Sequence, residues 1–212
     1  MANEALAIGR DHLFALLKQH RLLVPTRRAY HRTTQSHHRF HCHPNLIKAG
    51  YQPKSPEQLW VADITYLPTH EGEGYLSLVT DAYSRKIVGY QLGSDMKTST
   101  VKKALEQALK QRQSTTPLIH HSDRGIQYCS AEYQAIHQKH EITCSMTDGY
   151  DCYQNALAER VNGILKNEYL LIKPNNLKEA KKMVEQSITI YNKRRPHSAL
   201  KYKTPNEIHQ AF

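Results

Sequence analysis

Asp63 is the acidic residue whose sequence surroundings most need a chemical explanation. It lies in the middle of residues 59–67, Leu-Trp-Val-Ala-Asp-Ile-Thr-Tyr-Leu, where apolar side chains occupy both alternating faces. That pattern is typical of a central strand covered on two sides, in which a lone carboxylate costs several kcal/mol of desolvation. A buried Arg or Lys, or hydrogen bonds to Thr65 and nearby backbone, would offset the cost. A divalent cation held with other carboxylates would offset it as well.

Two other carboxylates could share such a cation. Asp123 follows the short run Leu-Ile-His-His-Ser, and α/β sheets tend to place their chemistry at the carboxyl ends of strands. Glu159 belongs to a predicted helix near 153–170 and lies opposite its apolar stripe. By pattern alone Glu159 is an ordinary solvated residue. Ala156 and Gly163 flank it, however, and such small residues would let another backbone or a ligand approach closely.

Three further features favour structural interpretations. Residues 37–43 contain four histidines and Cys42, but their spacing matches no regular zinc finger, so they favour a solvated linker that contacts phosphates. The four cysteines of the chain include no Cys-x-x-Cys pair, as expected for reduced thiols in the cytoplasm. Asp81 ends a predicted strand just before a turn, and we assign it to hairpin structure rather than to metal binding.

The net charge of +10 is unevenly distributed along the 212 residues. Residues 1–58 carry nine Lys and Arg against three Asp and Glu, and residues 160–203 carry eleven against three. Residues 59–159 carry nine against twelve. A mildly acidic centre between basic flanks suits a metal-dependent enzyme acting on a polyanion, and solvated lysine faces are the alternative. Neither a membrane span nor a secretory signal is expected, because no sufficiently long apolar run is present.

Hydrophobic periodicity predicts a β-β-β-α-β-α-β order followed by helices. Strands are expected at residues 59–67, 75–81, 86–92, 118–122 and 142–146. Helices are expected at residues 10–20, 99–112, 130–139, 153–170 and 176–195, with a last one after Thr204. The first helix would turn Leu13, Phe14, Leu16 and Leu17 inward. These elements predict an α/β domain with a mixed five-stranded sheet and helices on both faces.

The sequence motifs around the three carboxylates resemble those of a known family. They read Trp-Val-Ala-Asp-Ile-Thr-Tyr, His-His-Ser-Asp-Arg-Gly-Ile-Gln-Tyr and Tyr-Gln-Asn-Ala-Leu-Ala-Glu-Arg, and 35 residues separate Asp123 from Glu159. Asp-Ala-Tyr-Ser-Arg-Lys-Ile-Val-Gly at 81–89 and Tyr-Asn-Lys-Arg-Arg-Pro-His-Ser-Ala-Leu at 191–200 complete the set. Together they resemble the integrase core of DDE transposases and retroviral integrases. More narrowly, residues 43–211 resemble the downstream-frame (orfB-type) transposase of bacterial copy-and-paste insertion sequences.

The resemblance implies an RNase H-like fold and a Mg²⁺-dependent polynucleotidyl transferase. Asp63, Asp123 and Glu159 would be both catalytic residues and ligands of two Mg²⁺ ions about 4 Å apart, for which Mn²⁺ can substitute. The resemblance implies a DNA contact by Lys166 near the active site, and Asn155 and Arg124 are further candidate contacts. The basic residues at the end of the 176–195 helix suit phosphates, which adds Arg194, Arg195 and His197. For the basic cluster at 193–195, a solvated helix end is the alternative.

The resemblance also implies a domain organisation and partners. A partial helix-turn-helix remnant would occupy residues 1–24, a basic linker 25–57, the integrase-type core 58–171 and a basic helical extension 172–212. The partners would be transposon ends and target DNA, further copies of the chain on DNA, and an upstream-frame helix-turn-helix protein or its frameshifted fusion, in the bacterial cytoplasm. The alternatives are a catalytically weak, truncated DNA-binding remnant and an RNase H-like nuclease.

Overall fold

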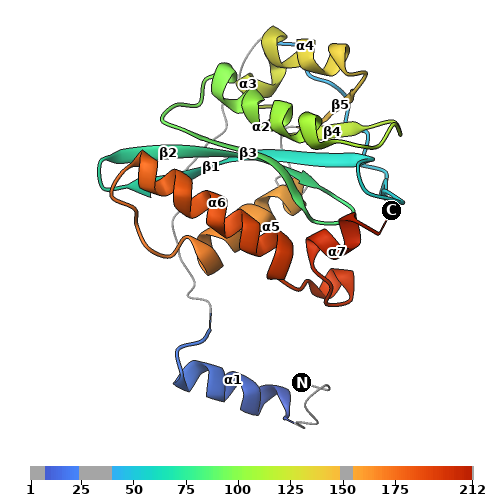
Figure 1. Ribbon diagram of the computed structural model, residues 1–212. Helices are drawn as coiled ribbons and strands as arrows, with labels where there is room; N and C mark the ends of the chain where they lie inside the picture. Colours follow the sequence, from blue (N-terminus) through green and yellow to red (C-terminus); the bar gives the residue numbers. More distant parts are fainter. Residues whose placement is uncertain (1–7, 24–39, 149–154, 212) are drawn as a thin grey trace. The chain divides into compact units, whose positions relative to one another are not determined.

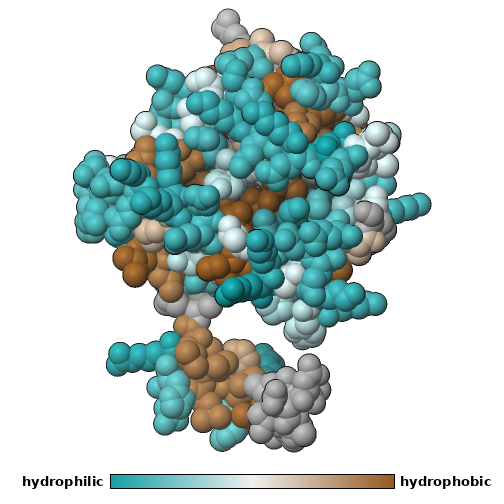
Figure 2. All heavy atoms as spheres, viewed as in Figure 1, coloured by the Kyte–Doolittle hydropathy of each residue, from teal (hydrophilic) through white to brown (hydrophobic). Residues whose placement is uncertain are grey.

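The computed structural model describes residues 8–23, 40–148 and 155–211 (Figure 1). The chain divides into two compact units, Met1–Tyr30 and His31–Phe212. The described part of the first unit contains one helix, α1 (Arg10–Gln19), none of whose residues is buried. Apolar side chains therefore gather on its surface (Figure 2), and Phe14 is 49% exposed rather than inward-facing. The predicted helix is confirmed, whereas the helix-turn-helix remnant remains a prediction.

The second unit is built on a five-stranded sheet in the order β3-β2-β1-β4-β5. The strands are β1 (Leu59–Thr69), β2 (Gly72–Asp81), β3 (Ile87–Gly93), β4 (Ile119–Ser122) and β5 (Thr143–Met146). The first three form an antiparallel meander, whereas β4 pairs with β1, and β5 with β4, in parallel. The predicted mixed sheet is confirmed, and β1 is its central strand.

Helices cover both faces of the sheet (Figure 1). One face carries α2 (Thr98–Gln111), α3 (Ile126–Cys129) and α4 (Ala131–Lys139), and the other carries α5 (Ala156–Ile164), the π-helix η3 (Leu165–Tyr169) and α6 (Leu177–Arg194). Trp60, Ala62 and Ile64 of β1 pack into the core of the first face. Leu67 packs into the core of the second face, which also contains residues of α5 and α6. The double coverage predicted for this strand is therefore confirmed.

Two helical segments differ from their predicted forms. The helix expected at 153–170 is α-helical only from Ala156 to Ile164 and continues as η3, and residues 153 and 154 lie outside the described residues. The short helix α3 was not predicted, because its four residues are too few to show a period. No described helix is both long and apolar enough to cross a bilayer.

The predicted C-terminal extension is an integral part of the second unit. Helix α6 begins after Asn176, whose side chain accepts a hydrogen bond from the Glu179 backbone N–H at 3.0 Å. The apolar face of α6 is buried in the same core as the meander, through Ala180, Val184, Ile188 and Tyr191. Helix α6 thus belongs to the same compact unit as the sheet, and the boundary expected at 171/172 stays a prediction.

The described part of the predicted linker is also packed on the core. The backbone N–H of Met146 in β5 donates to the Pro44 carbonyl at 3.3 Å, and the Leu46 N–H donates to Ser145 Oγ at 3.0 Å. Segment 44–46 thus covers the outer edge of the edge strand β5, which would otherwise present unpaired backbone groups.

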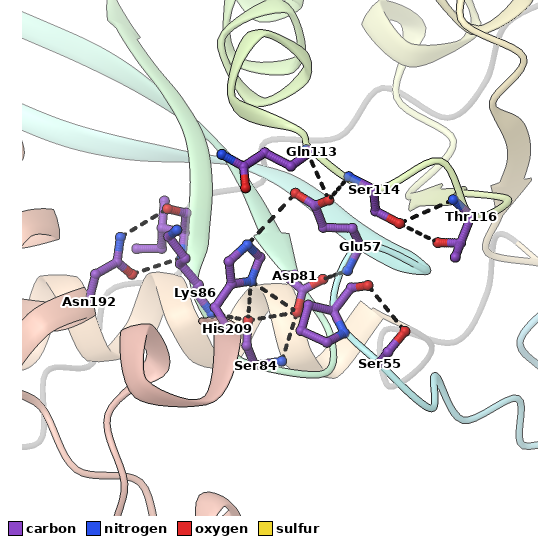
Figure 3. Close-up of polar contacts among 12 residues, drawn as sticks. Ser55, Glu57, Asp81, Ser84, Lys86, Gln113, Ser114, Thr116, Asn192 and His209 are labelled. Carbon is purple, nitrogen blue, oxygen red and sulfur yellow. Dashed lines mark hydrogen bonds and ion pairs between the residues drawn. The ribbon is translucent and has the colours of Figure 1, made fainter. Parts of the chain in front are cut away.

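A polar network ties the C-terminus to the start of the sheet (Figure 3). His209 of α7 (Pro205–His209), which follows the short η4 helix (Ser198–Leu200), lies 3.0 Å from Ser84 Oγ and 3.7 Å from Glu57 Oε1. Fully buried Asp81 accepts hydrogen bonds from the backbone N–H groups of Glu57 and Ser84, both at 2.7 Å. Asp81 therefore has the structural hairpin role predicted for it.

Candidate active site

Asp63 lies on β1 at the face covered by α5. Its Oδ1 accepts a hydrogen bond from the Ile64 backbone N–H at 2.9 Å, and its Oδ2 accepts one from Asn162 Nδ2 at 2.7 Å. No Lys or Arg of the described segments forms an ion pair with it within 4.0 Å. A salt bridge to this half-buried carboxylate is therefore absent from the described residues, and the two hydrogen bonds offset part of its desolvation.

Asp123 is brought level with Asp63 by strand pairing. Val61 pairs with His121 in the parallel β1–β4 ladder, and each aspartate follows two residues after its paired residue. Asp123 is the first residue after β4, so the parallel register sets it next to Asp63, and the charge of Asp123 adds to the raised pKa of Asp63. The Asp123 carboxylate accepts a hydrogen bond from the Gly125 N–H at 3.0 Å, which fixes it in the turn after β4.

Helix α5, which carries Glu159, packs over the part of β1 that contains Asp63. Asn162, one turn later on the helix, bonds directly to Asp63, so this face of α5 lies over the middle of β1. The Glu159 side chain itself is exposed. Burial raises its pKa, and the negative charge of Asp123 adds to the increase.

The pKa of Asp63 is affected by the charges of both other carboxylates. Burial, followed by the charge of Asp123 and more weakly that of Glu159, raises the pKa of Asp63 to about 7. The hydrogen bonds from Ile64 and Asn162 act in the opposite direction. The described residues contain no group of three His, Cys, Asp or Glu side chains close enough together to form a complete metal site. The carboxylates thus share one region and repel one another there.

These side chains suit a hard divalent cation by their chemistry. Mg²⁺ prefers oxygen ligands and is usually bound through one or two carboxylates together with substrate phosphates, so a protein cage of three ligands is not required. A cation would also neutralise the repulsion that raises the Asp63 pKa. The residues present therefore fit the predicted Mg²⁺ site in donor type and charge.

Three residues predicted to contact DNA surround the carboxylates. Lys166 of η3 is half-buried, and burial lowers the pKa of its ammonium group. The charge of Asp63 partly opposes this decrease, which places the ammonium group near that carboxylate. Arg124 is half-buried directly after Asp123. Asn155 is buried and donates from Nδ2 to the Ala62 carbonyl at 2.9 Å. Its side chain therefore ties α5 to β1, a structural role that the sequence pattern did not indicate.

The other three predicted DNA contacts differ in exposure. Arg194 is exposed at the end of α6. Arg195 forms a two-pronged ion pair with Glu168, and His197 is buried against Tyr191. Burial and the nearby arginines lower the pKa of His197 to about 4, so its ring is neutral at pH 7. Of this group, only Arg194 presents a charge that is not engaged in such an internal contact.

A second constellation of catalytic residue types is excluded by burial. Ser84, His209 and Glu57 are the residue types of a hydrolase triad. Ser84 is fully buried, and its hydroxyl donates to Asp81 Oδ1 at 2.7 Å. No substrate carbonyl can reach this hydroxyl, so the network serves the fold.

The chain matches family models and curated proteins of one kind. Two models described as "Integrase core domain" match residues 53–152 and 140–205. The "Insertion element IS600 uncharacterized 31 kDa protein" of Shigella sonnei is 38% identical over 100% of this chain and 79% of its own length. A "Putative transposase for insertion sequence element IS986/IS6110" of Mycobacterium tuberculosis is 36% identical over 79% of this chain, which spans 63% of that protein. Transposase InsF for insertion sequence IS3A of Escherichia coli is 40% identical over 58% of this chain and 43% of its own length.

Solved structures agree on the fold. The HTLV-2 integrase catalytic core domain, in a complex with magnesium, superposes with a TM-score of 0.61 at 23% identity, over 74% of this chain and 99% of that one. A chain of the simian T-cell lymphotropic virus intasome, in complex with PP2A regulatory subunit B56 gamma, gives a TM-score of 0.66 at 21% identity, over 86% of this chain and 61% of that one. The predicted RNase H-like fold is thereby confirmed. The sequence relatives and this fold together show that the chain belongs to the insertion-sequence transposases with an integrase core domain.

Proposed function

We propose that this chain cleaves and transfers DNA strands at the ends of an insertion sequence in a metal-dependent reaction. Asp63, Asp123 and Glu159 hold the metal, two Mg²⁺ ions for which Mn²⁺ can substitute. The observation that carries the proposal is geometric: the parallel register sets Asp123, just after β4, next to the middle of β1, and the Asn162–Asp63 hydrogen bond holds the helix that carries Glu159 over the same strand. The pKa of Asp63 is raised mainly by burial, and the charges of Asp123 and Glu159 add to the increase. Residues so distant in sequence have no packing reason to bring like charges together.

Each carboxylate has a distinct supporting structure. Asp63 is fixed on the central strand, Asp123 is fixed in the turn after β4, and Glu159 approaches from an exposed helix face. When bound, Mg²⁺ supplies Lewis-acid stabilisation of the attacking and leaving oxygens in an in-line displacement at phosphorus. The protein's contribution is to hold oxygen ligands at fixed positions, and no covalent protein intermediate is needed.

Basic residues near the carboxylates bind the DNA backbone in this proposal. Lys166 places a positive charge beside Asp63, where it attracts a phosphate of the strand being cut. Arg124 and the exposed Arg194 extend the contact surface. Contacts of this kind position DNA without reading its sequence.

The assembly that performs transposition contains more than this chain. We propose further copies of the chain on DNA and an upstream-frame helix-turn-helix protein, or a frameshifted fusion with it, as the source of sequence recognition. Base-specific readout usually requires a helix held in the major groove by a complete helix-turn-helix unit, and α1 is the single helix of the described N-terminal residues.

A strand-transfer assay tests the proposal. The full chain, supplied with the upstream-frame product and labelled DNA carrying the terminal repeats, should join the repeat ends to target DNA in Mg²⁺. Asp123→Asn and Glu159→Gln should abolish joining, whereas Glu185→Gln, on the exposed face of α6, should retain it. Near-normal joining by either of the first two variants would refute the assigned roles.

Two other functions give different results. A nuclease on RNA–DNA hybrids would cut such hybrids and join no DNA ends. A catalytically weak remnant would bind DNA and do neither. Competition between the terminal repeat and scrambled DNA at physiological salt measures the specificity of the chain alone, for which we expect a ratio near one. A preference of about 10³ or more would instead mark a specific binder.

A further inference from the structure

Two buried asparagines attach α5 to β1 at consecutive residues of the strand. Asn155 donates from Nδ2 to the Ala62 carbonyl at 2.9 Å, and Asn162 donates from Nδ2 to the Asp63 carboxylate at 2.7 Å. Both asparagines are 5% exposed. Asn155 is the N-cap of α5 and Asn162 lies about two turns later, so both point to the side of the helix that packs on β1, next to the exposed Glu159.

The two hydrogen bonds have different consequences. Asn155 donates to a backbone carbonyl, and any residue at position 62 would provide the same acceptor. Asn162 holds the carboxylate itself, and with the Ile64 N–H it occupies one acceptor site on each Asp63 oxygen. An ionised carboxylate has about four such sites, so each oxygen keeps one for a further ligand. Rotation of the carboxylate is prevented while its metal-binding capacity remains.

The acceptor of the Asn162 amide argues against a purely structural role. Asn162 donates to the Asp63 side chain, whereas Asn155 donates to backbone, and the Oδ1 atoms of both lack a hydrogen-bond partner among the described residues. Asn192 of α6 provides the contrast, because it accepts from the Ile87 N–H and donates to the Ile87 carbonyl, both at 2.9 Å. Both ends of the Asn192 amide bond to backbone, as expected of a structural residue, whereas Asn162 bonds to the carboxylate of Asp63.

We infer that Asn162 is a positioning residue that orients the Asp63 carboxylate to receive a divalent cation. This inference rests on the proposed function, since it takes Asp63 to be a metal ligand. Groups that hydrogen-bond a metal-ligating carboxylate fix its orientation, and their removal typically weakens metal binding by about 10–100-fold. Asn162 also links the cation site to α5, so Asp63 and Glu159 are oriented by one element.

Binding of Mn²⁺ to the full chain, measured without DNA from the electron paramagnetic resonance signal of free Mn²⁺, tests the inference. Asn162→Ala should weaken binding by about tenfold or more. Asn192→Ala is the matched control, a buried asparagine that joins a helix to a strand away from the carboxylates. It should lower the melting temperature and leave the Mn²⁺ affinity unchanged.

Each result has a defined meaning. Wild-type affinity in Asn162→Ala, or an equal loss in Asn192→Ala, would overturn the positioning role and leave the proposed function standing. Absence of Mn²⁺ binding by the wild-type chain would overturn both. If Asn162→Ala does not fold, Asn162→Leu preserves the side-chain volume without the N–H donor, and wild-type affinity in that variant would overturn the inference.

Discussion

Arg195 donates two hydrogen bonds of 2.7 Å to the Glu168 carboxylate, from Nε to Oε2 and from Nη2 to Oε1. This fork-like pair joins the residue after α6 to the π-helix η3, which also carries Lys166. The pair therefore fixes the segment from which Lys166 reaches the carboxylate region.

Arginines 194 and 195 should respond differently to substitution. Arg195→Ala should lower stability by about 1–2 kcal/mol, because it removes a two-pronged, half-buried ion pair. Arg194→Ala, at an exposed neighbouring position, should leave stability unchanged and reduce the salt dependence of DNA binding by about one phosphate contact. Chemical denaturation and DNA titration over a salt series measure both effects. Arg195→Ala with unchanged stability and weakened DNA binding would show that the ion pair is not its main role.

The sequence predicted most of this fold because the patterns of the long strands and helices are clear, whereas the four-residue helix α3 is too short to show a period. Residues 59–67 are apolar on both faces, and α6 has a clear apolar stripe after the Asn176 cap. The packing of the predicted linker and C-terminal extension on the core could not be predicted, since local periodicity does not show which other element a segment contacts. Basic residue type predicted a phosphate contact for Arg195, but only the fold places Glu168 opposite it.

The candidate site was predictable in part for the same reason. The motifs pointed to Asp63, Asp123 and Glu159, and strand register explains how the first two approach each other. Asn162 lay on the correct helix face but offered no signal of its own, because its hydrogen bond crosses to a strand 99 residues away in sequence.

Buried neutral histidines should make the protein sensitive to mild acid. Burial lowers the pKa of His137 and of His197 to about 4, below the ordinary value of 6.5. Between these values the unfolded chain binds more protons than the folded one, so stability is present above pH 6.5 and is lost as pH falls towards 4. Melting temperatures from pH 4 to 7.5 should show this decline, and His137→Phe should flatten it. A decline of equal size in that variant would exclude His137 as a source.

Asp63→Asn should stabilise the protein at alkaline pH. The folded pKa of about 7 lies above the ordinary 3.8, so ionisation of Asp63 removes stability as pH rises between these values. A difference of about 3 pKa units corresponds to about 4 kcal/mol, so neutral Asn should raise stability by up to about 4 kcal/mol at pH 8 and much less at pH 4. Denaturation at both pH values measures the difference. Asp95→Asn is the control, since Asp95 accepts stabilising hydrogen bonds from Thr100 and Lys97 and should gain nothing.

His209→Ala should loosen the C-terminal attachment. The variant removes the imidazole between Glu57 and Ser84 and should lower the melting temperature by several degrees. Since His209 helps to lower the pKa of Glu57, that pKa should rise in the variant. His140→Ala, an exposed histidine after α4, should change neither quantity. An unchanged melting temperature in His209→Ala would show that α7 contributes no stability through this residue.

The central claim is that Asp63, Asp123 and Glu159 form one cation site. The most direct measurement is a crystal structure of the full chain with Mn²⁺, with the ion located by its anomalous scattering. We expect Mn²⁺ to be bound by oxygens of Asp63 and Asp123, with Glu159 drawn towards it and Mn–O distances of about 2.0–2.3 Å. Mn²⁺ bound elsewhere with this region unoccupied, or any two of the three carboxylates more than about 10 Å apart, would contradict it.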